Sequence, residues 1–197
     1  MNKYKKIESL AEWETFLTKQ DPQIYVQSYS YGKFTKNIGD DFFVLGAYKG
    51  KELVGGSLVL EIHAKRGNFY YLPYGPILDF KNQDILNGFF RTLKNIAKDN
   101  GIDFIRISPF IEDTKQSRLS VKNAGFKKAP MHMIAETTWI LKLDQDEVDL
   151  LKDMKQNHRN LIRRSKREGV EIKISKDVKD IKLVHDQLVK TAERHDF

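Results

Sequence analysis

The chain has 197 residues, of which 40% are hydrophobic and 31% charged, and its formal net charge is +7. This composition supports a folded core and excludes a disordered chain, and the length suits one domain, or one domain with part of another. The lack of cysteine excludes disulfide bonds, thiol nucleophiles and cysteine-bound zinc, while the positive charge suits either an anionic partner or a lysine-rich surface.

The first part of the chain predicts two helices followed by antiparallel strands. Leu10–Lys19 has an apolar stripe at helical spacing, with Ser9 as its N-cap. Ile24–Gln27 is predicted as a short strand and Ser30–Asn37 as a second helix. Three strands are then predicted, the first two joined by a turn that contains Gly50. These strands are Phe42–Tyr48, Leu53–His63 and Asn68–Tyr74.

The middle of the chain alternates helices and strands. Asp84–Asn100 has one apolar helical face and is closed by Gly101. The elements predicted after it are a strand at Phe104–Ser108, a helix at Gln116–Asn123 and a long strand at Met131–Leu143. The order predicts an α/β fold in which helices flank a mixed central sheet.

A domain boundary is predicted at Leu143–Asp144, where Asp144 and Glu147 form a capping box. The boundary gives a first domain at 1–143 and a second segment at 144–197. A helix at Asp146–Glu168, a strand at Val170–Ser175 and a helix from about Asp177 are expected in that segment. So few residues cannot close a core of their own, so 144–197 is interpreted as the opening of a truncated second domain.

The helix predicted at Asp146–Glu168 carries an unusual concentration of positive charge. Between Lys152 and Arg167 there are seven basic residues and one acid, Asp153, so ion pairs along the helix are scarce. Five cations recur at helical spacing on one face, beside an apolar stripe expected to be buried. A polyphosphate contact and a solvated surface both remain open as explanations. The five are Lys152, Lys155, Arg159, Arg163 and Lys166.

Three segments carry a resemblance to the Fem family of peptidoglycan interpeptide-bridge aminoacyltransferases. The first combines a Thr138-Trp139 strand end with Arg159-Asn160-Leu161-Ile162-Arg163 and Gly169-Val170. The second is Tyr71-Leu72-Pro73-Tyr74-Gly75-Pro76-Ile77-Leu78-Asp79. The third, Gln27–Lys36, departs from the family pattern because Thr35 stands where a lysine aligns. The resemblance implies a GNAT-like acyltransferase fold for the first domain and for the truncated second one.

The resemblance also implies a function and its partners. An amino acid would pass from aminoacyl-tRNA to the stem-peptide amino group of a UDP- or lipid-linked muropeptide, with peripheral membrane contact and without a cofactor or metal. The residues implied to bind the muropeptide are Lys33, Lys36, Tyr71, Tyr74 and Gly75. The residues implied to contact tRNA are the five cations of the basic helix. The catalytic base is not identified.

Two other functions are weighed beside this one. An acyl-CoA-dependent N-acyltransferase would need a glycine-rich pyrophosphate loop before the helix at Asp84, but Asp79–Asp84 contains no glycine. A non-catalytic RNA- or muropeptide-binding fragment is the third interpretation. The five histidines are scattered without metal-ligand spacing, so no metal site is expected. The N-terminus does not resemble a signal peptide and no apolar run would span a membrane, which predicts a cytoplasmic protein.

Overall fold

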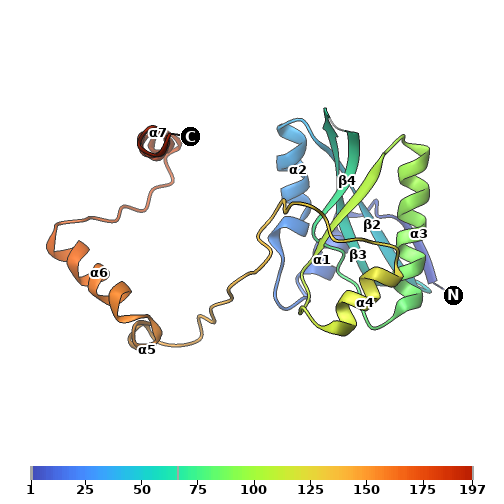
Figure 1. The fold of residues 1–197 in the computed structure, drawn as a ribbon, viewed down its shortest axis with the longest axis horizontal. Helices are drawn as coiled ribbons and strands as arrows, with labels where there is room; N and C mark the ends of the chain where they lie inside the picture. Colours follow the sequence, from blue (N-terminus) through green and yellow to red (C-terminus); the bar gives the residue numbers. More distant parts are fainter. Residues whose placement is uncertain (1, 66, 197) are drawn as a thin grey trace. The chain divides into compact units, whose positions relative to one another are not determined.

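The structure is a computed structural model that describes residues 2–65 and 67–196. It divides between Thr138 and Trp139 into two compact units, called unit 1 and unit 2 below. Unit 1 contains a five-stranded sheet and unit 2 contains helices joined by extended segments (Figure 1). Among the described residues, no helix is long and apolar enough to cross a membrane.

The sheet of unit 1 has the strand order β1-β2-β3-β4-β5. The first three pairings are antiparallel, and β4 and β5 run parallel, so the sheet is mixed as predicted. The β2–β3 hairpin turns at Gly50, whose φ of +65° favours glycine. The strand bounds are Asn2–Lys6 for β1, Asp41–Lys49 for β2, Glu52–Ala64 for β3, Gly67–Tyr74 for β4 and Phe104–Pro109 for β5.

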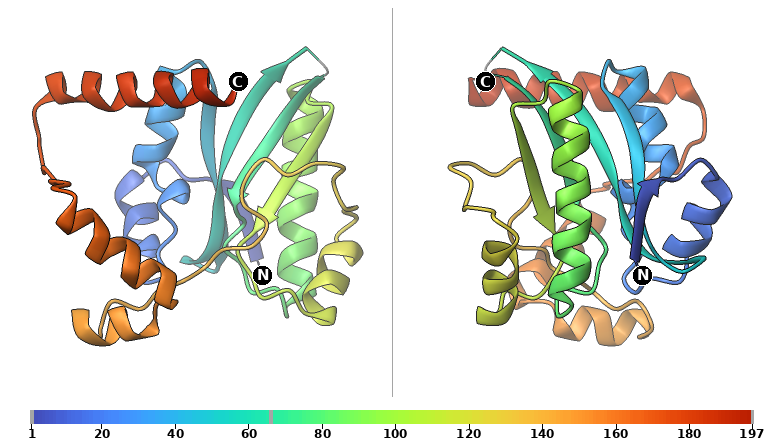
Figure 2. Two further views of the ribbon diagram at one scale, coloured as in Figure 1. Left: turned by 60° about the vertical axis from the view of Figure 1, so that its left-hand side comes forward. Right: turned by 90° about the vertical axis from the view of Figure 1, so that its right-hand side faces the viewer.

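Helices cover both faces of this sheet, with α1 and α2 on one side and α3 and α4 on the other (Figures 1 and 2). Each face has its own core: one is built around Trp13 and the other around Phe89, and neither side chain is exposed. The α/β fold with flanking helices is therefore confirmed. The helix bounds are Leu10–Leu17 for α1, Tyr29–Asn37 for α2, Gln83–Asp99 for α3 and Lys115–Asn123 for α4.

Three features of unit 1 differ from the predictions. Strand β1 was not predicted, because its lysines conceal the alternation that places Tyr4 against α3. The strand predicted at Ile24–Gln27 is wrong, since Tyr25–Gln27 forms a 3₁₀ turn that buries Gln27. The long strand predicted at Met131–Leu143 is also wrong: no described residue pairs with this segment as a strand, and Trp139 is 90% exposed.

Unit 2 departs further from expectation. The single helix predicted at Asp146–Glu168 is broken at Met154, and Asp146 rather than Asp144 is its N-cap. No strand forms at Val170–Ser175, where Ile172 and Ile174 are almost fully exposed. None of the unit's helices contains a buried residue, so the predicted buried stripe is wrong. The helices are α5 at Glu147–Asp153, α6 at Gln156–Arg167 and α7 at Ile181–His195, and a 3₁₀ turn spans Val178–Asp180.

Candidate functional site

The ladder between β3 and β4 opens near the C-terminal end of β4, and the side chain of Gln27 fills the opening. Regular pairing ends at Leu60–Tyr71, and a single bridge beyond it joins Gly56 to Ile77. Pro73 lies in the interval and cannot donate a ladder hydrogen bond, because proline has no N–H.

The Gln27 amide links the two strands across this opening. Its Oε1 accepts from the Leu58 amide at 2.8 Å, and its Nε2 donates to the Pro73 carbonyl at 2.5 Å. The Gln27 backbone carbonyl also accepts from Trp13 Nε1 at 2.7 Å. Gln27 is fully buried, so each of these polar groups depends on it for a partner.

The turn after β4 packs tightly against the same amide. A Cβ on Gly75 would lie 2.3 Å from Ser57 Oγ and 2.7 Å from Gln27 Nε2, so only glycine fits. The preceding residue, Tyr74, has a φ of +51°, which is strained for a residue with a side chain. Two local signals in the sequence accompany this packing, namely Gln27-Ser28 and the run Gly55-Gly56-Ser57. Neither signal predicts the packing by itself, because the contacts join segments that are far apart in the chain.

A tyrosine cluster lies beside this strand end. Tyr71 is paired with Arg106 across the parallel β4–β5 ladder, and its buried hydroxyl has no hydrogen-bond partner among the described residues. Burial raises the pKa of Tyr71, although the nearby Ser108 hydroxyl and the Arg106 charge oppose the shift. Burial also raises the pKa of Tyr31, and the neighbouring Tyr25 adds to it. These phenols are protonated at neutral pH, so they can donate hydrogen bonds but cannot act as bases.

Tyr74, at the end of β4, is partly exposed. Its ring meets Phe110 edge-on at a centroid distance of 5.4 Å, and its hydroxyl lies 3.3 Å from Thr138 Oγ1. Tyr74 is only partly buried, whereas Tyr71 and Gly75 are buried. Of the three residues predicted here to bind substrate, Tyr74 is the least buried.

The two candidate lysines on α2 already have partners. Lys33 Nζ lies 5.1 Å from the centre of the Tyr29 ring, and Lys36 pairs with Asp41 at 2.9 Å. That carboxylate raises the pKa of Lys36. Thr35 is buried and its hydroxyl donates to the Gly32 carbonyl, so it cannot replace a phosphate-binding lysine.

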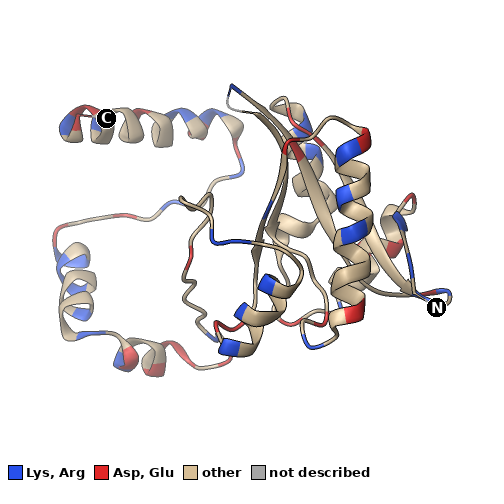
Figure 3. Cartoon of the chain, turned by 45° about the vertical axis from the view of Figure 1, so that its right-hand side comes forward, with Lys and Arg blue, Asp and Glu red and all other residues tan. Residues whose placement is uncertain are grey.

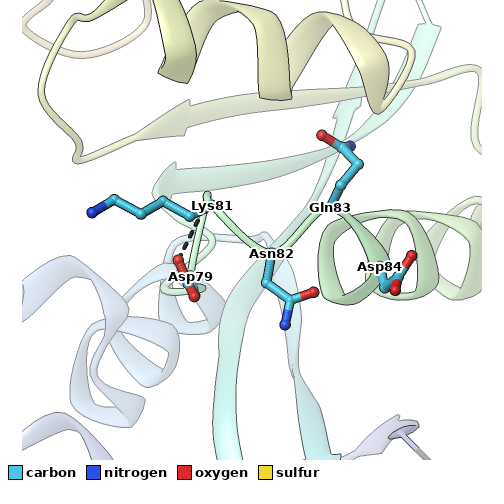
Figure 4. Close-up of a pocket in the computed structure, with 5 residues that line it drawn as sticks. All are labelled: Asp79, Lys81, Asn82, Gln83 and Asp84. Carbon is cyan, nitrogen blue, oxygen red and sulfur yellow. Dashed lines mark hydrogen bonds between the residues drawn. The ribbon is translucent and has the colours of Figure 1, made fainter.

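The segment between β4 and α3 forms an open hollow of about 470 Å³, lined by Asp79, Lys81, Asn82, Gln83 and Asp84 (Figure 4). The Asn82 side chain caps α3 by accepting from the Ile85 amide at 3.2 Å. Asp79 accepts from the Lys81 amide at 2.9 Å. A CoA pyrophosphate needs free amides and no nearby carboxylates, so this helix start is unsuited to it.

The basic helix of unit 2 is an elbow of two helices. Arg159 on α6 directs Nη1 at the last carbonyls of α5, with distances of 2.7 Å to Lys152 O and 2.5 Å to Met154 O. Lys152 pairs with Asp149 at 2.6 Å. The five cations therefore do not share one helical face as predicted. The elbow encloses a shallow hollow of about 430 Å³, lined by Val148, Leu151, Lys152, Arg159 and Arg163.

We expect Arg159→Ala to loosen the elbow, because the α5 carbonyls lose a charged donor. Hydrogen exchange of the α5 amides should become about tenfold faster, which corresponds to roughly 1.4 kcal/mol. Arg163→Ala is the matched control, since Arg163 makes no such contact among the described residues. Equal acceleration in both variants would show that Arg159 does not hold the elbow.

A mixed sheet with helices on both faces and parallel β4 and β5 is the GNAT-like α/β fold that the resemblance implied. A family model described as FemAB family matches residues 9–197. The chain belongs to the FemAB family.

Particular relatives agree with this membership. Lipid II:glycine glycyltransferase of Staphylococcus aureus is 26% identical over 136 residues, which is 64% of this chain and 32% of the relative. The same enzyme from strain USA300 gives the same values. A crystal structure of FemX matches with a TM-score of 0.81 and 20% identity, covering 99% of this chain and 51% of FemX. The chain thus spans about half of FemX and a third of the glycyltransferase.

Proposed function

We propose that this chain acts as an aminoacyltransferase that builds peptidoglycan bridges on the cytoplasmic side of the membrane. It would move an amino acid from aminoacyl-tRNA to the stem-peptide amino group of a lipid- or nucleotide-linked muropeptide. The observation that carries the proposal is the FemAB family match over residues 9–197. The glycyltransferase relative, whose name specifies lipid II, supports the lipid-linked acceptor.

The proposed reaction is aminolysis of an ester. The acceptor nitrogen attacks the aminoacyl carbonyl carbon, the carbon–oxygen ester bond breaks, and the tRNA hydroxyl leaves with a proton that originates on the amine. An aminoacyl ester is already activated, so positioning and stabilisation of the developing oxyanion are the main requirements. Burial raises the pKa of the partly exposed Tyr31, so this tyrosine stays protonated at neutral pH and suits hydrogen-bond donation in such a site.

We place the acceptor at the C-terminal end of β4. Tyr74 is partly exposed and would contact the acceptor, while Tyr71 and Gly75 are buried and shape the turn. Lys33 and Lys36 would contribute positive charge from α2, and Lys36 would first have to leave Asp41.

We place the donor tRNA on unit 2. Lys155, Arg163 and Lys166 are exposed and have no ion-pair partner among the described residues, so they are available for phosphates. Lys152 and Arg159 would mainly maintain the elbow, given their contacts with Asp149 and with the α5 carbonyls. The proposed tRNA-binding surface therefore contains three of the five cations, Lys155, Arg163 and Lys166.

Salt-dependent tRNA binding tests this placement. Arg163→Ala with Lys166→Ala should weaken binding and reduce the log–log salt slope by about 0.7–0.9 for each lost phosphate contact. The control pair is Lys176→Ala with Lys190→Ala, which removes equal charge elsewhere in unit 2. If both pairs lose the same affinity, the α6 cations form an ordinary solvated surface and the tRNA placement fails.

The acyl-CoA-dependent alternative has weaker support. The hollow at Asp79–Asp84 presents two carboxylates and a capped helix start where pyrophosphate would bind. We therefore expect no tight acetyl-CoA binding by calorimetry. A dissociation constant near 1 μM, about −8 kcal/mol, would favour the alternative.

A further inference from the structure

A second basic region lies in unit 1, on α4 and in the segment that follows it. Residues 114–135 contain five Lys or Arg residues and no Asp or Glu. Three of the five are on α4 and two follow it closely. The five are Lys115, Arg118, Lys122, Lys127 and Lys128.

Helix α4 has two distinct faces. Its inward face holds the buried residues Ser120 and Ala124, and Val121 packs against the core on that side. The outward face consists of residues three or four apart, all exposed, which therefore project together. These residues are Lys115, Arg118, Leu119 and Lys122.

Most of this charge is uncompensated. Arg118 forms a two-pronged ion pair with Asp113, which raises the arginine pKa and lowers that of the carboxyl. Lys115, Lys122 and Lys127 have no ion-pair partner among the described residues. Lys128 has a long contact with Glu136 at 3.9 Å. An ordinary surface would mix charges more evenly.

Helix α3 extends the basic surface. Lys94 Nζ donates to the Ala124 carbonyl at 3.0 Å, which joins α3 to the end of α4. Arg91 and Lys98 lie on the same exposed side of α3 as Lys94, and its acids are confined to the first and last turns. The positively charged segments of α3 and α4 lie beside one another in Figure 3.

Aliphatic side chains accompany these cations. Leu119 on the outward face of α4 is 48% exposed, and Met131 and Met133 in the following segment are 62% and 43% exposed. Sites for single-stranded nucleic acid commonly pair cations with stacking aromatic rings, whereas lipid interfaces pair them with inserted apolar side chains such as leucine. Phe126, which follows α4, is instead packed against Phe90 and Lys94.

We propose that the outward face of α4, with the adjoining cations of α3, docks on an anionic lipid surface. Lys115, Lys122 and Arg91 would meet acidic headgroups, and Leu119 would enter the headgroup boundary. The partner follows from charge complementarity and the exposed aliphatic residues. The inference does not depend on the proposed aminoacyl transfer, because adsorption to vesicles can be measured without it.

Vesicle co-sedimentation of the full chain tests the proposal. The probes are phosphatidylcholine vesicles with and without 30% phosphatidylglycerol, chosen as roughly the acidic fraction needed for a strong surface potential. Lys115→Ala with Lys122→Ala should lower the partition coefficient on acidic vesicles about 25-fold, from a loss of about fivefold per lysine. Lys49→Ala with Lys51→Ala, in the β2–β3 turn, is the matched control and should change it less than threefold. Circular dichroism melts confirm that each variant is folded.

Leu119→Ser separates a membrane from an RNA partner. It should lower vesicle binding several-fold, most clearly at high salt, and leave tRNA binding unchanged. Three results would overturn the proposal: equal losses in the two lysine pairs, unchanged vesicle binding by Leu119→Ser, or a loss of tRNA binding alone in the α4 pair. The last would identify the face as an RNA contact.

Discussion

Replacing Gln27 with leucine should destabilise unit 1 by about 3–5 kcal/mol, because two buried backbone groups lose their partners. The Leu58 amide and the Pro73 carbonyl both bond to the Gln27 amide, and leucine of similar size offers neither donor nor acceptor. The opening between β3 and β4 leaves them no alternative within the ladder.

The measurement uses the tryptophans. Trp13 is buried beside Gln27 in unit 1 and Trp139 is exposed in unit 2, and the chain has two tryptophans. In a Trp139→Phe background, urea titration followed by fluorescence reports the unfolding of unit 1 alone. Gln23→Leu, at an exposed glutamine, should change the free energy of unfolding by less than about 0.5 kcal/mol. A similar small change for Gln27→Leu would show that the amide does not hold the strands.

Gly75→Ala should destabilise unit 1 by about 2–4 kcal/mol, because the new methyl group overlaps two buried polar atoms. The φ of Gly75 lies outside the left-handed region, so the cost is steric rather than conformational. The overlap is severe on Ser57 Oγ, at 2.3 Å, and smaller on Gln27 Nε2, at 2.7 Å.

A double-mutant cycle isolates this contact. Ser57→Ala removes the hydroxyl that the Gly75→Ala methyl would meet, so the double variant should recover at least about 1 kcal/mol relative to the sum of the single variants. The same Trp13 fluorescence measures all three proteins. Strict additivity would mean that the turn after β4 moves away from β3, contrary to the packing described here.

Elements with strong local signals were predictable from the sequence. Helix α3 has an apolar stripe, an Asn82 cap and Gly101 in the left-handed region, and the β2–β3 hairpin turns on Gly50. Local chemistry fixes such elements without information from the rest of the fold. Strand β1 lacked such a signal, since its identity depends on pairing with β2.

The incorrect predictions in unit 2 also concern features that depend on contacts between separate elements. Val170–Ser175 has the composition of a strand, but a strand forms only where another backbone pairs with it. The break at Met154 was not visible, because methionine and lysine both favour helices. The Arg159 contact with the α5 carbonyls arises from the break itself. Periodicity alone therefore assigned Arg159 to a binding face.

The strand end that carries the candidate site was predictable from the sequence, but the contacts around its turn were not. The sequence Tyr71–Asp79 indicated a strand end with a special turn, and the structure describes that turn in atomic terms. The side chain of Gln27 forms hydrogen bonds with Ser57, Leu58 and Pro73, and no local sequence pattern relates these positions. Its bond to the Pro73 carbonyl fixes the backbone next to Tyr74, the partly exposed residue of the proposed acceptor site.

A transfer assay tests the proposed function most directly. This chain is incubated with tRNA charged with a labelled amino acid and with a lipid-linked muropeptide, and the muropeptide is analysed by mass spectrometry; acetyl-CoA replaces the charged tRNA in a parallel reaction. We predict that the labelled aminoacyl group appears on the stem-peptide amine, that Tyr74→Ala reduces its rate, and that acetyl-CoA yields no product. Acetylation of the muropeptide, or binding of both substrates without transfer of the label, would contradict the proposed aminoacyltransferase.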